Sequence, residues 1–194
     1  MGNALTRMDL QAFLDWEDQQ EEKHEFHRGE VSAMVGARRV HGIVSLNLAT
    51  GLMSQLKGAP CRVFVDSMKV QIGSDTILYP DVFVTCDATD LRTERIFTAP
   101  TVVVEVLSPS TEQYDRGSKF TFYRSLASLR EYLLVDPQTR AVELFRRGED
   151  GLFTLHDLTR RDRVELESIG CTLLADDIFD GVDPGPGQQA EPPV

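Results

Sequence analysis

The segment Thr101–Leu107 constrains the fold more than any other part of the chain. Its sequence, TVVVEVL, is apolar and β-branched at almost every position. Such a continuous run is typical of a strand that is buried on both faces in the centre of a sheet. Glu105 is the exception, and an unpaired carboxylate in these surroundings would be costly to bury. We therefore expect Glu105 to face a cavity, a cation or a strong hydrogen-bond donor.

Helical and strand patterns alternate along the rest of the chain. Apolar residues at three- and four-residue spacing predict three helices, the first preceded by a capping box at Thr6 and Asp9. Short alternating or β-branched segments predict a hairpin and further strands, and polar residues 87–100 predict a surface loop. The helices are expected at 6–22, 40–57 and 115–126, the hairpin at 25–31, and the strands at 62–72, 77–85, 132–135, 142–146 and 153–158. These elements predict an α/β or α+β fold built around a mixed β-sheet flanked by helices.

The length of the chain, 194 residues, suits one domain. We expect this domain to span residues 1–180, followed at 181–194 by a disordered tail rich in Pro and Gly. No apolar run approaches the roughly 20 residues of a membrane-spanning helix, and the N-terminus carries no apolar signal segment, so we expect a cytoplasmic protein without membrane contact. The three cysteines are far apart and form no CxxC pair, so they are expected to be buried thiols: Cys61, Cys86 and Cys171.

The net charge of −11 at first argues against a nucleic-acid partner, because phosphate contacts need Lys and Arg. The acidic excess lies at the two ends of the chain. Residues 1–30 hold 8 acidic and 3 basic side chains, and residues 160–194 hold the same numbers. Residues 31–159 are almost neutral, with 15 acidic and 14 basic side chains, so a nucleic-acid partner remains compatible with the sequence.

A series of polar residues in these elements points to metal chemistry. Asp81 follows Pro80 in one strand segment and Glu105 lies in the next strand, beside the carbonyl group of Val106. Two carboxylates and a carbonyl are the hard oxygen ligands that Mg²⁺ prefers. On the following helix, Lys119 could hold an attacking water or stabilise the negative charge of a phosphoryl transition state.

Two further residues share a helix face with that lysine. Asp115 and Tyr123 lie four residues before and after Lys119, so all three project from the same side of the helix. That side can point at the metal.

The order of these residues resembles the PD-(D/E)xK restriction-endonuclease-like superfamily. The motif residues are Pro80-Asp81, Glu105-x-Leu107 and Lys119-x3-Tyr123. Most of the chain also resembles the Uma-type restriction endonuclease family, formerly a domain of unknown function. That wider resemblance includes Glu25, Gly29-Glu30-Val31, His41, Arg62-Val63-Phe64-Val65, the run from Glu105 to Thr111, and Asp115-Arg116-Gly117-x-Lys119.

The resemblance implies a restriction-endonuclease-like fold and phosphodiester hydrolysis that depends on Mg²⁺ or Mn²⁺. It implies that Asp81 and Glu105 are metal ligands and that Glu25 is an additional acidic group. The motif lysine of the superfamily normally stands two residues after the acid, where this chain has Leu107. We therefore expect Lys119 to replace it, with Tyr123 beside it. The implied substrate is nucleic acid, with DNA preferred.

Each of these residues also has a structural interpretation. Asp81 could be a turn residue at the start of a strand, and Glu105 could form a buried ion pair with an arginine, Arg124 or Arg62. Lys119 could be a solvated residue paired with Asp115, Tyr123 could belong to the core, and Glu25 could end a solvated helix. At the level of function, the alternative is a nuclease fold without effective catalysis that binds nucleic acid or protein.

Other polar residues carry weaker signals. His41 could assist at the site or cap the second helix, and capping is the interpretation that we prefer. His24 and His27 are expected on opposite sides of a hairpin, which argues against a zinc site. Ser108 and Ser110 lack the GxSxG motif of serine hydrolases. Because one site cuts one strand, cleavage of a duplex would favour a homodimer.

Overall fold

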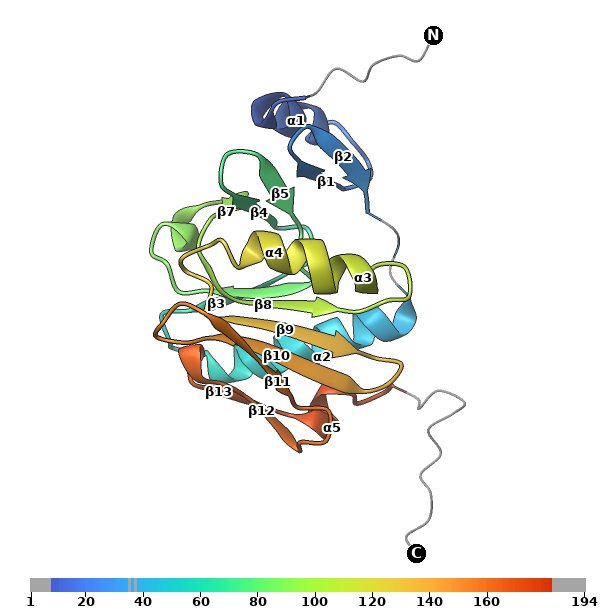
Figure 1. The fold of residues 1–194 in the computed structure, drawn as a ribbon, viewed down its shortest axis with the longest axis vertical. Helices are drawn as coiled ribbons and strands as arrows, with labels where there is room; N and C mark the ends of the chain where they lie inside the picture. Colours follow the sequence, from blue (N-terminus) through green and yellow to red (C-terminus); the bar gives the residue numbers. More distant parts are fainter. Residues whose placement is uncertain (1–7, 35, 37, 183–194) are drawn as a thin grey trace, which may run out of the picture.

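The computed structural model describes residues 8–34, 36 and 38–182, and its largest element is a six-stranded mixed sheet (Figure 1). The strand order is β11–β10–β9–β8–β6–β3. The strands are β3 (Arg62–Val65), β6 (Val82–Thr85), β8 (Pro100–Val106), β9 (Glu131–Asp136), β10 (Ala141–Arg147) and β11 (Phe153–Asp157). β8 pairs antiparallel with β6 and parallel with β9, so the prediction of a central strand is confirmed.

Helical segments cover the two faces of this sheet. α2 (Arg39–Gln55) packs on one face, and the other carries a continuous helical segment made of α3 (Glu112–Tyr114), the π-helical turn η2 (Asp115–Lys119) and α4 (Phe120–Tyr123). Side chains of β8 alternate between these layers. Val102, Val104 and Val106 belong to the core under α2, whereas Val103 and Leu107 pack with Tyr123 on the opposite face. Strand alternation therefore turns Glu105 toward η2 and α4.

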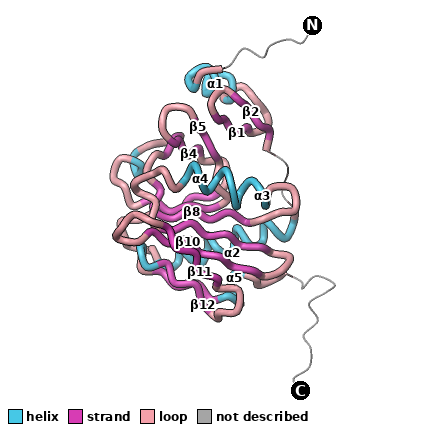
Figure 2. The backbone as a smooth tube through the Cα atoms, viewed as in Figure 1, coloured by secondary structure: helices cyan, strands magenta, loops and turns pink. Residues whose placement is uncertain are grey.

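A five-stranded sheet lies beside the large one, in the order β2–β1–β5–β4–β7 (Figure 2). Its strands are β1 (His24–His27), β2 (Glu30–Ala33), β4 (Lys69–Ile72), β5 (Thr76–Leu78) and β7 (Ile96–Phe97). α1 (Leu10–Glu17) packs on this sheet through Phe13, which stacks on Phe26. The predicted hairpin is confirmed, with its turn at Arg28 and Gly29, both at positive φ.

The remaining described elements complete the α+β fold. β12 (Arg163–Leu166) and β13 (Cys171–Leu174) form a two-stranded sheet, and α5 (Ala175–Ile178) follows it. Two short 3-10 turns, η1 (Asp90–Arg92) and η3 (Glu167–Ile169), lie in the connections. None of these five elements, nor β7, was predicted. The segment 87–100 is therefore only partly a surface loop, because Asp90 is buried and accepts hydrogen bonds from Thr85, Thr98 and Ala99.

Two predicted strands were wrong because each is two strands in different sheets. The segment 62–72 divides at Asp66 and Ser67, which take positive φ and so cannot continue an extended strand. The segment 77–85 divides at residues 79–81, where the chain passes from the small sheet to the large one. The apolar pattern continues through both breaks because β4, β5 and β6 bury apolar side chains and the more exposed β3 carries apolar ones as well, but the two halves of each segment lie in different sheets.

The helix boundaries also differ from prediction. α1 begins after Asp9, whose side chain caps the N–H of Ala12, and it ends at Glu17, five residues before the expected end. Thr6 lies outside the described residues. α2 matches its prediction closely and is followed by Gly58 at φ +86°. The third helical segment begins three residues early, and the π-turn inside it was not predicted.

The expectation of three buried thiols was wrong for two of the cysteines. Cys61 and Cys86 form a disulfide because they flank the register pair Arg62 and Thr85 at one end of β3 and β6, with Cα atoms 4.1 Å apart. Cys171 is a free, buried thiol as expected. The predicted tail, from Asp183 onward, lies outside the described residues. No helix among those described is long and apolar enough to cross a membrane.

Candidate active site

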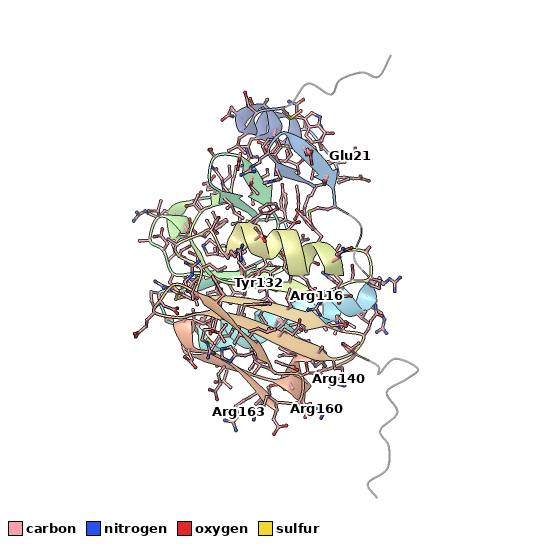
Figure 3. All side chains as sticks on the ribbon, in the orientation of Figure 1. Glu21, Arg116, Tyr132, Arg140, Arg160 and Arg163 are labelled. Atoms are coloured by element: carbon pink, nitrogen blue, oxygen red, sulfur yellow. A yellow bond between two sulfur atoms is a disulfide. The ribbon has the colours of Figure 1, made fainter. Side chains whose placement is uncertain are left out.

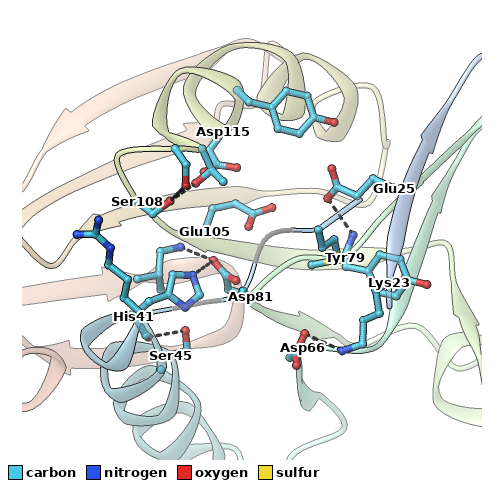
Figure 4. Close-up of a pocket in the computed structure, with 18 of the residues that line it drawn as sticks. Lys23, Glu25, His41, Ser45, Asp66, Tyr79, Asp81, Glu105, Ser108 and Asp115 are labelled. Carbon is cyan, nitrogen blue, oxygen red and sulfur yellow. Dashed lines mark hydrogen bonds and ion pairs between the residues drawn. The ribbon is translucent and has the colours of Figure 1, made fainter. Parts of the chain in front are cut away.

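A cavity of about 1130 Å³ opens between the two sheets (Figure 4). Residues of α2, β1, β8, η2 and the link between β5 and β6 line it. Five of the six predicted site residues are among them: Glu25, Asp81, Glu105, Val106 and Lys119. The structure therefore brings together side chains that lie up to 94 positions apart in the sequence.

Asp81 occupies the link that crosses from the small sheet to the large sheet. The hydrogen bond and the ion-pair contact of its carboxylate are both made by one of the two oxygens, Oδ2. Oδ2 accepts a hydrogen bond from the backbone N–H of Val106 at 2.7 Å and lies 3.1 Å from Nε2 of His41. About 21% of the Asp81 side chain stays exposed, so the carboxylate is both fixed by the protein and accessible from the cavity.

Glu105 projects from β8 into the layer between the sheet and η2. Its side chain is almost fully buried, and Oε1 lies 3.2 Å from Nζ of Lys119. The two atoms are within ion-pair distance, yet Oε1 has no hydrogen bond of acceptable geometry within the described part of the chain. Burial raises the pKa of Glu105 well above its ordinary value, and the Lys119 charge offsets this only in part. The alternative interpretation, an ion pair with Arg124 or Arg62, is wrong because the partner is Lys119.

Lys119 ends the π-turn and directs its amine at three carboxylates. Nζ lies 3.1 Å from Glu25, 3.2 Å from Glu105 and 3.4 Å from Asp115. Burial lowers the pKa of this amine, but the surrounding carboxylates more than offset it, so the net pKa is well above the ordinary value. Lys119 is thus a buried ammonium ion rather than a solvated side chain, and the π-turn, a feature frequent at functional sites, sets its position.

Glu25 reaches this cluster from the small sheet. β1 pairs with β5 through Phe26 and Ile77, and strand alternation turns Glu25 away from Phe26. The N–H of Tyr79 donates to Glu25 Oε1 at 3.4 Å, which connects the carboxylate to the link that carries Asp81. Glu25 is buried in a strand, so the interpretation as a solvated helix end is wrong.

Tyr123 is the predicted site residue that does not line the cavity. It is fully buried in the core and packs against Tyr132. Its hydroxyl has no hydrogen-bond partner among the described residues. Burial raises the pKa of Tyr123, and the nearby Glu105 charge adds to this shift. Tyr123 therefore lies in the core next to Glu105. Its position agrees with the interpretation of Tyr123 as a core residue.

His41 is the residue whose role we misjudged. Arg38 is the N-cap of α2, and His41 lies within the first turn with its ring directed at Asp81. Burial lowers the pKa of His41, but the hydrogen bond and charge of Asp81 outweigh this, so the net shift is upward. The spacing of His41 and Ser45 on one helix face could have indicated a shared cavity wall, since both residues line it.

The donor set of the cavity fits a divalent cation. Among the described residues, the ion-pair contacts of its four central carboxylates are with one ammonium and one imidazole, those of Lys119 and His41, and the carboxylates are Glu25, Asp81, Glu105 and Asp115. Glu105 Oε1 and Asp115 Oδ1 are buried and lie 3.2 and 3.4 Å from the single amine of Lys119, which makes no well-directed hydrogen bond to either atom.

Asp81 and Glu105, with the adjacent Val106 carbonyl, supply oxygen ligands of the type that Mg²⁺ or Mn²⁺ takes. No group of three or more His, Cys, Asp or Glu side chains in the described ranges forms a complete metal cage, so backbone and water would complete the shell. The two hairpin histidines do not contribute, because His24 contacts Glu17 and His27 contacts Thr76.

The cavity lining is mostly acidic, with seven carboxylates against three basic side chains, Lys23, Arg38 and Lys119. Arg160 and Arg163 are at the end of the molecule opposite Glu21, which lines the cavity (Figure 3). An anionic substrate would therefore approach the cavity past acidic side chains, and a bound cation would reduce that repulsion.

The sequence matches the Uma2 family model, described as "Putative restriction endonuclease", over residues 10–174. This match covers most of the chain. The chain belongs to the Uma2 family. The family resemblance inferred from the motif residues is thereby confirmed.

Relatives and a solved structure agree with this membership. The chain is 38% identical over 177 residues to "Uncharacterized protein slr1290" of Synechocystis, covering 91% of this chain and 93% of the relative. It is 34% identical over 150 residues to "Uncharacterized protein sll1609" of the same organism, covering 75% and 84%.

A crystal structure of "a putative nuclease belonging to DUF820" from Anabaena variabilis superposes with a TM-score of 0.74, covering 89% of this chain and 97% of that one. At 20% identity this likeness shows the fold alone. The family and the fold support a nuclease-type enzyme, whereas the roles of the individual residues in the cavity stay predictions.

Proposed function

We propose that this protein is a metal-dependent nuclease that hydrolyses phosphodiester bonds in nucleic acid, with DNA as the substrate. The observation that carries the proposal is the buried Glu105 carboxylate, whose Oε1 lacks a hydrogen bond while Asp81 and Lys119 share its cavity. A purely structural carboxylate at this depth would have its acceptors satisfied. Lys119 Nζ lies 3.2 Å from this oxygen but also contacts Glu25 and Asp115, so the excess of carboxylates supports a site for a cation.

In this proposal Asp81, Glu105 and the carbonyl of Val106 hold Mg²⁺ or Mn²⁺. When bound, the cation supplies Lewis-acid chemistry at the phosphate. Lys119 is the third member of the site, because its buried ammonium can stabilise the negative charge that develops as the phosphodiester is attacked. Glu25 keeps that amine in place by contacting Nζ at 3.1 Å. Tyr123 lies in the core next to Glu105.

A cleavage assay tests this function. Supercoiled plasmid, single-stranded DNA and RNA would each be incubated with the protein in Mg²⁺, in Mn²⁺ and in EDTA. We expect cleavage of DNA that requires the cation and is lost in Asp81→Asn. Nicked plasmid would indicate that one site acts on one strand, whereas direct linearisation would support a homodimer that acts on both strands.

The binding-module alternative has one observation in its favour. The Lys119 amine is already engaged by three carboxylates at 3.1 to 3.4 Å, which is also what a closed structural network looks like. If the wild-type protein binds nucleic acid but cleaves none of the three substrates with either cation, the nuclease proposal is wrong and this alternative replaces it.

A further inference from the structure

We infer that His41 is a positioning residue that fixes Asp81 so that this carboxylate offers only Oδ1 to a divalent cation. The inference rests on the proposed function, since it concerns the same site. It starts from the contacts of one oxygen atom. Oδ2 of Asp81 receives the N–H of Val106 at 2.7 Å and faces Nε2 of His41 at 3.1 Å.

The two contacts reach Oδ2 from separate parts of the fold. Val106 is the last residue of β8, and His41 stands in the first turn of α2 with its ring directed at Asp81 (Figure 4). A carboxylate oxygen has two in-plane lone-pair positions, so two donors use the hydrogen-bonding capacity of Oδ2. Oδ1 is left as the oxygen that can bind a cation.

The backbone contact alone would not fix the carboxylate. A single hydrogen bond from Val106 lets the Asp81 side chain rotate about that bond, because the terminal torsion of Asp is broad. Asp81 directly precedes β6, and its carbonyl accepts a hydrogen bond from the N–H of Asp66 at 3.1 Å, which restrains the backbone but not the side-chain torsions. The imidazole of His41 supplies a second point of attachment, and about 18% of its side chain is exposed, so it forms part of the cavity wall.

α2 holds His41 rigidly. The helix is 17 residues long and buries Val44 and Leu48 against the large sheet, one and two turns after His41. The imidazole is therefore a donor on a fixed scaffold. Hydrogen bonds that orient metal ligands in this way usually change metal affinity by about 10 to 100-fold when they are removed.

Mn²⁺ binding measured by calorimetry, without nucleic acid, tests the inference. His41→Ala is expected to weaken Mn²⁺ affinity by about 10-fold or more. His41→Gln keeps an N–H donor of similar reach and is expected to restore most of the affinity. His156→Ala is the matched control, because His156 lies on β11 outside the cavity, and it should bind Mn²⁺ like the wild type.

A double-mutant cycle separates positioning from direct ligation. If His41 acts through Asp81, then His41→Ala added to Asp81→Asn should cause no further loss of affinity. An equal loss in both backgrounds would show that His41 does not act through Asp81 and would overturn the inference. Unchanged affinity in His41→Ala alone would overturn it as well. Failure of the wild type to bind Mn²⁺ would instead sink the proposed metal-dependent function.

A crystal structure with Mn²⁺ gives a second readout that does not depend on the stability of any variant. The anomalous signal of Mn²⁺ should lie next to Oδ1 of Asp81, with Oδ2 still bound to Val106 and His41. Bidentate binding by Asp81, or direct coordination by His41, would contradict the inference.

Discussion

Two buried glutamates on neighbouring strands have opposite environments. Glu131 on β9 and Glu105 on β8 are both almost inaccessible to solvent. Glu131 accepts hydrogen bonds from Arg146 Nε at 2.9 Å, from the N–H of Glu167 at 3.1 Å, and from both the N–H and the hydroxyl of Ser168. Glu105 has one oxygen without any hydrogen bond, and its charge partner Lys119 is shared with other carboxylates.

This difference teaches how a structural carboxylate is distinguished from a candidate ligand. Burial is the same in the two cases, so burial alone does not mark a functional residue. Glu131 fastens η3 to the sheet, and every partner it contacts belongs to the protein. Glu105 lines a cavity, and its charge partner Lys119 is shared with Glu25 and Asp115, so the carboxylates of this cluster outnumber its ammonium.

Exchanging the carboxylates that form the site should have the largest effect. Asp81→Asn and Glu105→Gln each remove one charged oxygen ligand, so we expect either change to abolish cleavage that depends on Mg²⁺ or Mn²⁺, a loss of at least about 10³-fold. The fold should persist, because neither residue makes the contacts that hold the core. Plasmid assays would measure the cleavage rate, circular dichroism would measure whether the fold persists, and calorimetry would measure Mn²⁺ affinity. Unchanged Mn²⁺ affinity in both variants would remove these residues from the site.

Removing the charge partner of Glu105 should have the next largest effect. Lys119→Ala is expected to keep Mn²⁺ binding and to lower the cleavage rate by about 10²-fold, the scale for losing one group that stabilises developing charge. Lys57→Ala, an exposed lysine after α2, is the control and should cleave normally. A cleavage rate unchanged in Lys119→Ala would support a purely structural role for this amine.

Replacing Glu131 should lower stability without changing Mn²⁺ affinity. Glu131→Gln leaves Arg146 and the η3 donors only partly satisfied, so we expect the free energy of unfolding to fall by about 1–3 kcal/mol. Mn²⁺ affinity should not change, because Glu131 does not line the cavity. Urea denaturation and calorimetry would measure both quantities. A loss of Mn²⁺ binding at normal stability would break the distinction between the two carboxylates.

The smallest expected effect is a pH dependence of the free energy of unfolding that arises from Glu105. Burial raises the pKa of Glu105 above its value in the unfolded chain. The unfolded state therefore loses its proton first, and the free energy of unfolding falls as pH rises from about 4.3, the ordinary Glu value, toward the folded pKa. In EDTA, Glu105→Gln should remove this decline.

The stabilisation produced by Mn²⁺ gives the matching measurement. It should grow between about pH 5 and pH 8, because the cation binds the ionised carboxylates. Melting temperatures in EDTA and in Mn²⁺ across this range would test both statements. A Mn²⁺ effect that stays constant with pH would argue against carboxylates clustered around a cation.

Sequence patterns predicted the elements with one dominant local signal. The apolar β-branched run identified β8 as a central strand. The four-residue spacing of Val44, Leu48 and Leu52 identified α2 with bounds within two residues of those observed. The motif order Asp81, Glu105, Lys119 indicated residues that the structure does place in one cavity. These results depend on side-chain periodicity and on the chemistry of a carboxylate in an apolar strand, both of which are local properties.

Sequence patterns failed where neighbours from distant segments decide the outcome. The segments 62–72 and 77–85 look like single strands because both halves of each are apolar, but each crosses between sheets. The crossing at residues 79–81 is what places Asp81 at the cavity. Likewise, Cys61 and Cys86 meet only because β3 pairs with β6.

The sequence by itself determined the family, the α+β class, the central strand and several acidic residues that line the cavity. Only the tertiary structure decided what His41 and Lys119 contact. His41 meets Asp81 across 40 residues of chain, and Lys119 meets Glu25 across 94. Sequence periodicity predicts which face of its helix or strand a residue occupies. It does not predict which residues of other elements will pack against that face. The contacts of both side chains are therefore a property of the packed fold.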